Sequence, residues 1–438
     1  MGSYIPSTAE ERQRMLEAIG LSSTEELYRD VPASARLKVL DIPEGMSEME
    51  AAQAVGALAD KNRRYRAIFR GAGAYDHYIP AIVKTVTSKE EFVTAYTPYQ
   101  AEISQGVLQS IFEYQTQICE LTGMDVSNAS VYDGAVAAAE AVMMCQEHKR
   151  SGVVLPDTVD PQVLGVVRTY CESRSVPVTV LPTTGYALDA DALKAALADN
   201  VACVYAQSPN FYGVLEDMDA ITAIAHEAGA KVIMAANPIS LGLLKTPGEY
   251  GADIAVGEGQ PLGMPLSFGG PYLGFMACKA AMMRKLPGRI VGETVDKEGR
   301  RCFVLTLQAR EQHIRREKAS SNICSNEALC AMTASVYLAA MGPAGLKRAA
   351  ENSAAHAHCL AGLLNAIPGF ELKTAKPFFH EFVTACPVPP ETLQKRLDDE
   401  GMLGGLPLDD GILWCCTEKN TRGQIERLAE ICREVSRK

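Results

Sequence analysis

The side chains around Pro98 are of the types that bind a small polar substrate. Two phenols, one amide and one carboxylate lie close together there, from Tyr96, Tyr99, Gln100 and Glu102. Phenols and amides both donate and accept hydrogen bonds, whereas an ionised carboxylate only accepts them. Pro98 biases Thr97 toward extended backbone, so we expect a loop that enters a helix near Ile103. The alternative is that the two tyrosines only pack as amphipathic side chains.

A second polar segment combines a basic run with small side chains. Residues 310–318 contain five basic side chains, His313 included, and Ser320, Ser321 and Asn322 follow shortly after. Successive small residues can present backbone N–H groups and hydroxyls to an anion such as a phosphate. The alternative is that the basic run is simply a solvated helix face.

The glycine-rich segment 257–263 follows an apolar run and resembles a dinucleotide-binding loop. Such a loop must lead into a helix whose N-terminus faces the phosphate. Pro261 and Pro265 lack N–H donors and block a regular helix at this place. We therefore do not expect a nicotinamide cofactor here.

The composition is that of a globular protein that does not bind nucleic acid non-specifically. The 438 residues carry 53 acidic and 42 basic side chains, a net charge of −11. A diffuse acidic surface repels a phosphate backbone. No uninterrupted apolar run reaches the roughly 18 residues of a membrane span, so no membrane association is expected.

The cysteines predict free thiols rather than a disulfide or metal framework. There are 13 of them, scattered and never spaced C-x-x-C. No Cys/His cluster has the spacing of a zinc site, so we expect no metal. The first residues lack the apolar segment of a secretory signal, and a cytoplasmic location is expected.

The pattern of apolar residues predicts three regions along the chain. Residues 1–105 read as helices and loops, with capping boxes that begin at Thr8, Ser23 and Ser47. Residues 106–325 alternate short apolar runs with helical segments, which is typical of a parallel α/β sheet. Residues 326–438 predict a long helix and then a small α/β domain of strand, helix, strand and helix.

Several longer motifs resemble the glycine decarboxylase P-protein family over essentially the whole chain. They are TPYQAEISQG at 97–106, FEYQT at 112–116, LTGMDVSNAS at 121–130, GAGAYDHYIP at 71–80, FGGPYLGF at 268–275 and LQAREQHIRREKASSNIC at 307–324. The match is to the N-terminal half of the long single-chain form, and so to the first subunit of the split form. The resemblance implies an α/β pyridoxal-phosphate transferase architecture of fold type I. It would have a large mixed-sheet domain and a small C-terminal α/β domain.

Both anchors that pyridoxal phosphate needs in that fold are missing from this sequence. The aspartate that pairs with the pyridinium nitrogen should follow the strand 231–234, where Ala235 and Ala236 stand instead. The Schiff-base lysine position falls on Gln260, or one residue earlier on Gly259. No lysine lies between Lys245 and Lys279 to replace it. The resemblance therefore places the working lysine in a second subunit, and no residue of this chain alone is expected to be catalytic.

The family implies that the assembled enzyme decarboxylates glycine and passes the aminomethyl group to the lipoyl group of the H-protein. This chain would then shape the cleft, with contacts to substrate or cofactor from the segment at 96–102. Ser320, Ser321 and Asn322 would lie near the cofactor phosphate. Two alternatives remain open at this point: a self-sufficient pyridoxal-phosphate enzyme, and a scaffold that stabilises the second subunit without touching substrate.

Overall fold

The computed structural model describes residues 7–37, 41–93, 97–323 and 325–437, and its contacts divide the chain into two units. The first unit, Met1–Arg64, contains α1 (Ala9–Ala18), η1 (Thr24–Tyr28), η2 (Ala33–Ala35) and α2 (Glu48–Ala59). The capping boxes at Thr8 and Ser47 are confirmed. The one at Ser23 is wrong: its side chain makes no capping bond, and Glu26 accepts hydrogen bonds from Ser22 instead.

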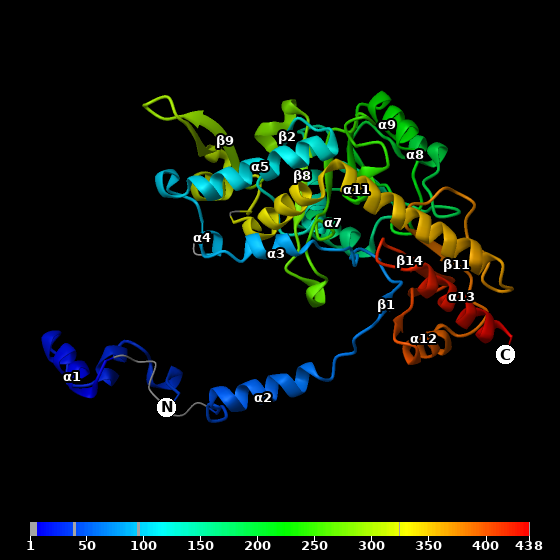
Figure 1. Cartoon of the computed structure of the whole chain (residues 1–438). Coiled ribbons are helices and arrows are strands. Elements are labelled where there is room, and N and C mark those ends of the chain that lie inside the picture. Colours follow the sequence, from blue (N-terminus) through cyan, green and yellow to red (C-terminus); the bar gives the residue numbers. More distant parts are fainter. Residues whose placement is uncertain (1–6, 38–40, 94–96, 324, 438) are drawn as a thin grey trace. The chain divides into compact units, whose positions relative to one another are not determined.

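The second unit, Tyr65–Lys438 (Figure 1), is built on a seven-stranded sheet. The strand order is β2-β8-β7-β6-β5-β3-β4. The strands are β2 (Val126–Ser127), β3 (Gly152–Pro156), β4 (Val178–Leu181), β5 (Val201–Gln207), β6 (Lys231–Ala235), β7 (Ile254–Glu258) and β8 (Gly274–Cys278). All neighbouring pairs are parallel except the two that include β8. The predicted α/β alternation is confirmed, and the sheet is mixed.

Helices cover both faces of this sheet. On one face, α6 (Gly134–Cys145) and α7 (Pro161–Ser173) pack over the strands in a core that includes Val142 and Val167. On the other face the core includes Tyr114 and Ala334. The helices of that face are α5 (Gln105–Thr122), α8 (Ala190–Ala196), α9 (Met218–Glu227) and the first part of α11 (Ala328–Asn365). A parallel sheet buried on both faces places its strand ends, and any site there, on a rigid frame.

A smaller three-stranded sheet with the order β11-β14-β13 follows α11. Its elements and the helices beside it are β11 (Glu381–Thr384), α12 (Pro390–Asp399), β13 (Leu406–Leu408), β14 (Gly411–Cys415) and α13 (Arg422–Ser436). Trp414 is fully buried in the core of this part and donates from Nε1 to Thr384 Oγ1 at 2.9 Å. The predicted strand, helix, strand and helix are confirmed.

The remaining elements connect these two sheets or lie at their edges. A hairpin of β9 (Ile290–Val295) and β10 (Arg301–Thr306) packs against α5. β1 (Ala67–Ile68) pairs in parallel with β12 (Met402–Leu403), and α3 (Ala81–Thr87) packs on α11. Contacts join everything from Tyr65 onward into one unit. The three regions 1–105, 106–325 and 326–438 remain a prediction.

Helix α11 is, by length and composition alone, apolar enough to cross a membrane. Its buried side chains instead belong to protein cores: Ala331 and Ala334 to the core under the large sheet, Leu360 and Leu364 to that of the small sheet. At Gly342, with φ of 59°, the helix is kinked just before Pro343. α11 therefore serves as a core helix that links the two sheets.

Candidate functional site

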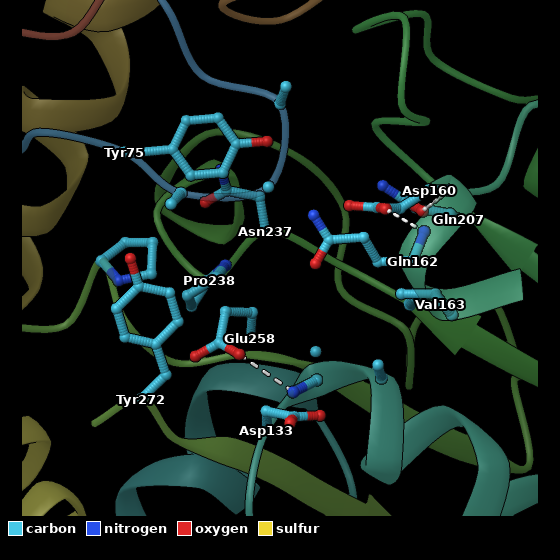
Figure 2. Close-up of a pocket in the computed structure, with 18 of the residues that line it drawn as sticks. Tyr75, Asp133, Asp160, Gln162, Val163, Gln207, Asn237, Pro238, Glu258 and Tyr272 are labelled. Atoms are coloured by element: carbon cyan, nitrogen blue, oxygen red, sulfur yellow. Dashed lines mark hydrogen bonds between the residues drawn. The ribbon is translucent and has the colours of Figure 1, made fainter. Parts of the chain in front are cut away.

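A pocket of about 500 Å³ lies where the central parallel strands of the large sheet end. Its walls come from the residues that follow β3, β5, β6 and β7, from the segment 72–75 and from the start of β11 (Figure 2). Ligands of open α/β sheets bind outside the carboxyl ends of the strands. The volume is that of a small-molecule site, so this pocket is the candidate functional site.

One wall is the N-terminus of α6, where a carboxylate already takes the place of an external anion. Glu258 Oε2 accepts the N–H of Gly134 at 2.9 Å, as Figure 2 shows, and Oε1 accepts the N–H groups of Gln260 and Leu273. Asp133 caps the same helix by accepting from the N–H of Val136. Burial raises the pKa of Glu258 to about 7, against the opposing effect of these bonds.

Gln260, at the expected lysine position, is buried, and its amide is fully engaged in hydrogen bonds to the protein. Its Oε1 accepts the N–H of Tyr75 at 2.8 Å, and its Nε2 donates to the carbonyls of Tyr75 and Met264 at 3.0 and 2.8 Å. The amide therefore joins the segment 72–75 to the turn after β7. A glutamine suits this role because one side chain both donates and accepts.

The positions that follow β6 contribute no acid to the pocket. Ala235 and Ala236 line it, and the next residue, Asn237, uses its Oδ1 to accept the N–H of Ile239. Its Nδ2 lies 3.3 Å from His380 Nε2. Neither alanine can pair with a pyridinium nitrogen, as the sequence indicates.

The opposite wall holds a buried carboxylate that the small sheet contributes. Glu381 accepts from the N–H of Ala72 at 2.7 Å and from the hydroxyl of Tyr75 at 2.8 Å. Burial, together with a smaller contribution from the nearby Asp160, raises the pKa of Glu381 to about 7. Burial also raises the pKa of Asp160. The pocket thus brings together acids from parts of the chain that are distant in sequence.

These residues do not fit pyridoxal phosphate. A phosphate at the start of α6 would meet the Glu258 carboxylate, and among the residues described around the pocket there is no lysine or arginine. Gln260 cannot form a Schiff base, and the alanines after β6 cannot hold the ring nitrogen. The segment 257–263 likewise leads into a turn rather than a helix.

The predicted substrate loop lies away from this pocket. Tyr96 falls outside the described residues. The loop enters the 3-10 turn η3 (Ala101–Ile103) and then α5, as expected, and Tyr99, Gln100 and Glu102 are exposed. The hydroxyl of Tyr99 accepts from Arg289 Nη2 at 3.0 Å, and the guanidinium lies 4.9 Å from its ring centroid. The contact of Tyr96, Tyr99, Gln100 and Glu102 with substrate or cofactor remains a prediction.

The second predicted segment is also separate from the pocket. Residues 308–318 form short helical turns, which are exposed from Gln312 to Lys318 but contain the buried Glu311. Asn322 is exposed, the carbonyl of Ser320 accepts from Arg174, and Ser321 donates to the buried Glu140 at 2.9 Å. Burial raises the pKa of Glu140 to about 7. The role of Ser320–Asn322 near a phosphate remains a prediction.

Sequence reasoning missed four residues of the pocket: Tyr75, Asp160, Glu258 and Glu381. Tyr75 stands within the motif at 71–80 and Glu258 within the segment at 257–263, but neither motif by itself indicates a role for these two side chains. Asp160 and Glu381 have no local signal. Tyr75 and Glu381 are 306 positions apart in the chain, and the fold alone brings them together.

Comparison with solved structures confirms the predicted fold type I architecture. A sphingosine-1-phosphate lyase of Burkholderia pseudomallei matches with a TM-score of 0.68 at 15% identity, over 92% of this chain and 94% of its own. A C-DES variant with glycine covalently linked to its PLP cofactor matches with a TM-score of 0.62 at 14% identity, over 89% and 99%. These likenesses show the fold.

Matches at higher identity extend along the whole chain. The probable glycine dehydrogenase (decarboxylating) subunit 1 of Desulfitobacterium hafniense is 49% identical, over 97% of this chain and 98% of its own. The protein of the same name from Moorella thermoacetica is 49% identical over 99% of both. A crystal structure of glycine decarboxylase (P-protein) of the glycine cleavage system, in inhibitor-bound form, is 44% identical. Its TM-score is 0.93, over 99% of this chain and 100% of that one. The family model of the glycine cleavage system P-protein matches residues 2–432, and the chain therefore belongs to that family.

Proposed function

We propose that this chain is the non-lysine subunit of the glycine cleavage system decarboxylase and works with a second, lysine-bearing subunit. The observation that carries the proposal is its full-length match to proteins named subunit 1. The altered anchors at Gln260, Ala235 and Ala236 support it. The activity is decarboxylation of glycine, with transfer of the aminomethyl group to the lipoyl group of the H-protein.

Pyridoxal phosphate supplies the electron sink for decarboxylation in this family. We place it on the lysine of the second subunit, because the pocket of this chain does not fit it. This chain would instead complete the cleft of its partner, with Tyr96, Tyr99, Gln100 and Glu102 toward the substrate. Ser320, Ser321 and Asn322 would lie near the partner's cofactor phosphate. These contacts follow from the polar chemistry of the two segments and from the motifs that carry them.

Reconstitution tests the proposed division of labour. Exchange of labelled bicarbonate into glycine is measured for this chain, for the second subunit and for their mixture, each with pyridoxal phosphate and H-protein present. We expect exchange from the mixture and only background from this chain alone. Full exchange by this chain alone would favour a self-sufficient enzyme.

The variant Gln260→Lys is expected to remain inactive without the partner. The new lysine still lacks an acid after β6, and the Tyr75 N–H loses the acceptor that Gln260 provides. Bicarbonate exchange is compared with that of Gln260→Met, which removes the amide without adding an amine, and circular dichroism verifies that both variants fold. Glycine decarboxylation by Gln260→Lys on its own would show that the missing lysine is the sole defect of this site.

A further inference from the structure

The charge of the pocket is acidic without compensation from basic side chains. Four carboxylates line it, from Asp133, Asp160, Glu258 and Glu381, and the described residues of its walls include no lysine or arginine. Asp133 and Glu258 lie together at the start of α6, with Asp160 across the pocket (Figure 2). Glu381 is near Asp160.

The hydrogen bonds that Glu258 and Glu381 accept come from neutral donors. Glu258 accepts three backbone N–H groups, and Glu381 accepts one backbone N–H and the Tyr75 hydroxyl. Neutral donors orient a carboxylate but do not cancel its charge, and buried charges in proteins are normally paired. The raised pKa values of Glu258 and Glu381, about 7 each, follow from the burial of acids that have no cationic partner.

The remaining walls suit a cation that has an apolar body. Four tyrosines line the pocket: Tyr75, Tyr132, Tyr205 and Tyr272. The faces of aromatic rings attract ammonium groups. His380, also on the wall, is 1% exposed, and its Nδ1 has no hydrogen-bond partner. Burial lowers the pKa of His380 well below its ordinary value, so the ring is neutral near pH 7 and adds no positive charge to the wall.

Two other classes of ligand agree less well with these walls. Phosphates and carboxylates would be repelled by the four acids, and Glu258 already accepts the N–H of Gly134 at the start of α6. For a metal ion, no group of three or more His, Cys, Asp or Glu side chains in the described ranges is placed to hold one. The ligand chemistry that remains is a hydrogen-bond donor with positive charge and a small carbon skeleton.

We propose that this pocket is a binding site for a small primary ammonium ion that carries no carboxylate. The ammonium group would donate to Glu381 and Asp160, while the tyrosine rings contact its carbon chain. Glycine itself is excluded, because its carboxylate would face the acids of the opposite wall. The proposal goes beyond the decarboxylase function and does not depend on it.

The test is a ligand-observed NMR titration of the full chain with n-propylammonium, with n-propanol and propionate as neutral and anionic counterparts. We expect saturable binding of the ammonium ion in the millimolar range, corresponding to about −4 kcal/mol by the standard relation, and none of either counterpart. Equal binding of n-propanol, or an absence of saturation by the ammonium ion, would overturn the proposal.

The pH dependence of this binding follows from the acids. The titratable groups that face Glu381 are Tyr75, Asp160, His380 and Cys415, and those that face Glu258 are Asp133, Tyr114, Tyr272 and Cys330. Burial raises the pKa of each of these tyrosines and thiols above its ordinary value. Between pH 6 and 8 the carboxylates therefore gain charge while the alkylammonium keeps its own. Affinity should rise about 10-fold over this interval, and an affinity that falls as pH rises would contradict the proposed contacts.

Variants separate the pocket from the rest of the acidic surface. Glu381→Gln and Asp160→Asn keep the shape of each side chain and remove its charge. Each substitution should weaken binding of the ammonium ion at pH 8 about 10-fold. Asp219→Asn is the control, because Asp219 is an exposed carboxylate paired with Lys245 outside this pocket. Circular dichroism verifies that each variant folds. Because Glu381→Gln and Asp160→Asn test the same pocket independently, the proposal can still be tested if one of them is misfolded. Wild-type affinity in either folded acid variant would remove that residue from the site, and wild-type affinity in both would overturn the proposal.

Discussion

Tyr99→Ala is expected to lower glycine decarboxylation by the assembled enzyme about 100-fold without loss of the complex or of its cofactor. A loop that positions substrate acts on transition-state geometry, where a misplacement of about 1 Å can have an effect of this size. Tyr99 is suited to this role because it is 61% exposed, while the buried Arg289 fixes its ring by a hydrogen bond to the hydroxyl and a cation–π contact. Glu102→Ala should have a similar effect through the same loop.

Three measurements on the same preparations distinguish positioning from stability. Size-exclusion chromatography reports assembly, the visible spectrum reports the cofactor, and bicarbonate exchange into glycine reports turnover. Tyr99→Phe keeps the ring beside Arg289 and should lose less activity than Tyr99→Ala. Glu227→Ala, at an exposed position on α9, is the control for Glu102→Ala. Wild-type exchange in both alanine variants would instead support the scaffold alternative, and activity that falls only with assembly would make the loop structural.

Gly213→Ala is expected to destabilise the second unit by more than ~4 kcal/mol, among the largest effects of a point substitution. Gly213 has a φ of 83°, and an added Cβ would collide with the backbone carbonyl of Glu381. Its own carbonyl accepts the N–H of Phe379 at 3.1 Å. The substitution therefore combines backbone strain with displacement of the small sheet from the pocket wall.

The matched control for Gly213 is Gly299→Ala. Gly299 also has positive φ, 78°, but nothing lies within 4 Å of its added Cβ. Gly299→Ala should lower the free energy of unfolding by only ~1–2 kcal/mol, the cost of left-handed backbone at a residue with a Cβ. Urea unfolding, followed by the fluorescence of the single tryptophan, Trp414, compares the two variants. Equal midpoints would show that close contact at Gly213 contributes nothing beyond its backbone conformation.

The sequence predicts the frame of the site well because local patterns determine it. The alternation of apolar runs and helices predicts β3 to β8 and the small α/β part, and the residues after β6 and β7 then identify Ala235, Ala236 and Gln260 as altered anchors. Two-residue β2 escapes this reasoning, since two residues carry no periodicity. The regular frame thus follows from sequence, whereas its shortest edge strand does not.

The chemistry of the pocket could be predicted only in part. Pro261 and Pro265 indicate that no helix follows Glu258, but they do not reveal that its carboxylate turns back to the start of α6. Glu381 enters from a different sheet, and only the packing of β11 beside the segment 72–75 brings it to Tyr75. Such contacts depend on tertiary structure, so composition and spacing carry no signal for them.

The location of the covalently bound cofactor tests the central claim most directly. The two subunits are assembled with pyridoxal phosphate, reduced with borohydride, digested and analysed by mass spectrometry for pyridoxyl-lysine. We expect a stoichiometric label on one lysine of the second subunit and none on this chain, in a complex that exchanges bicarbonate into glycine. A stoichiometric pyridoxyl-lysine in this chain would contradict the account.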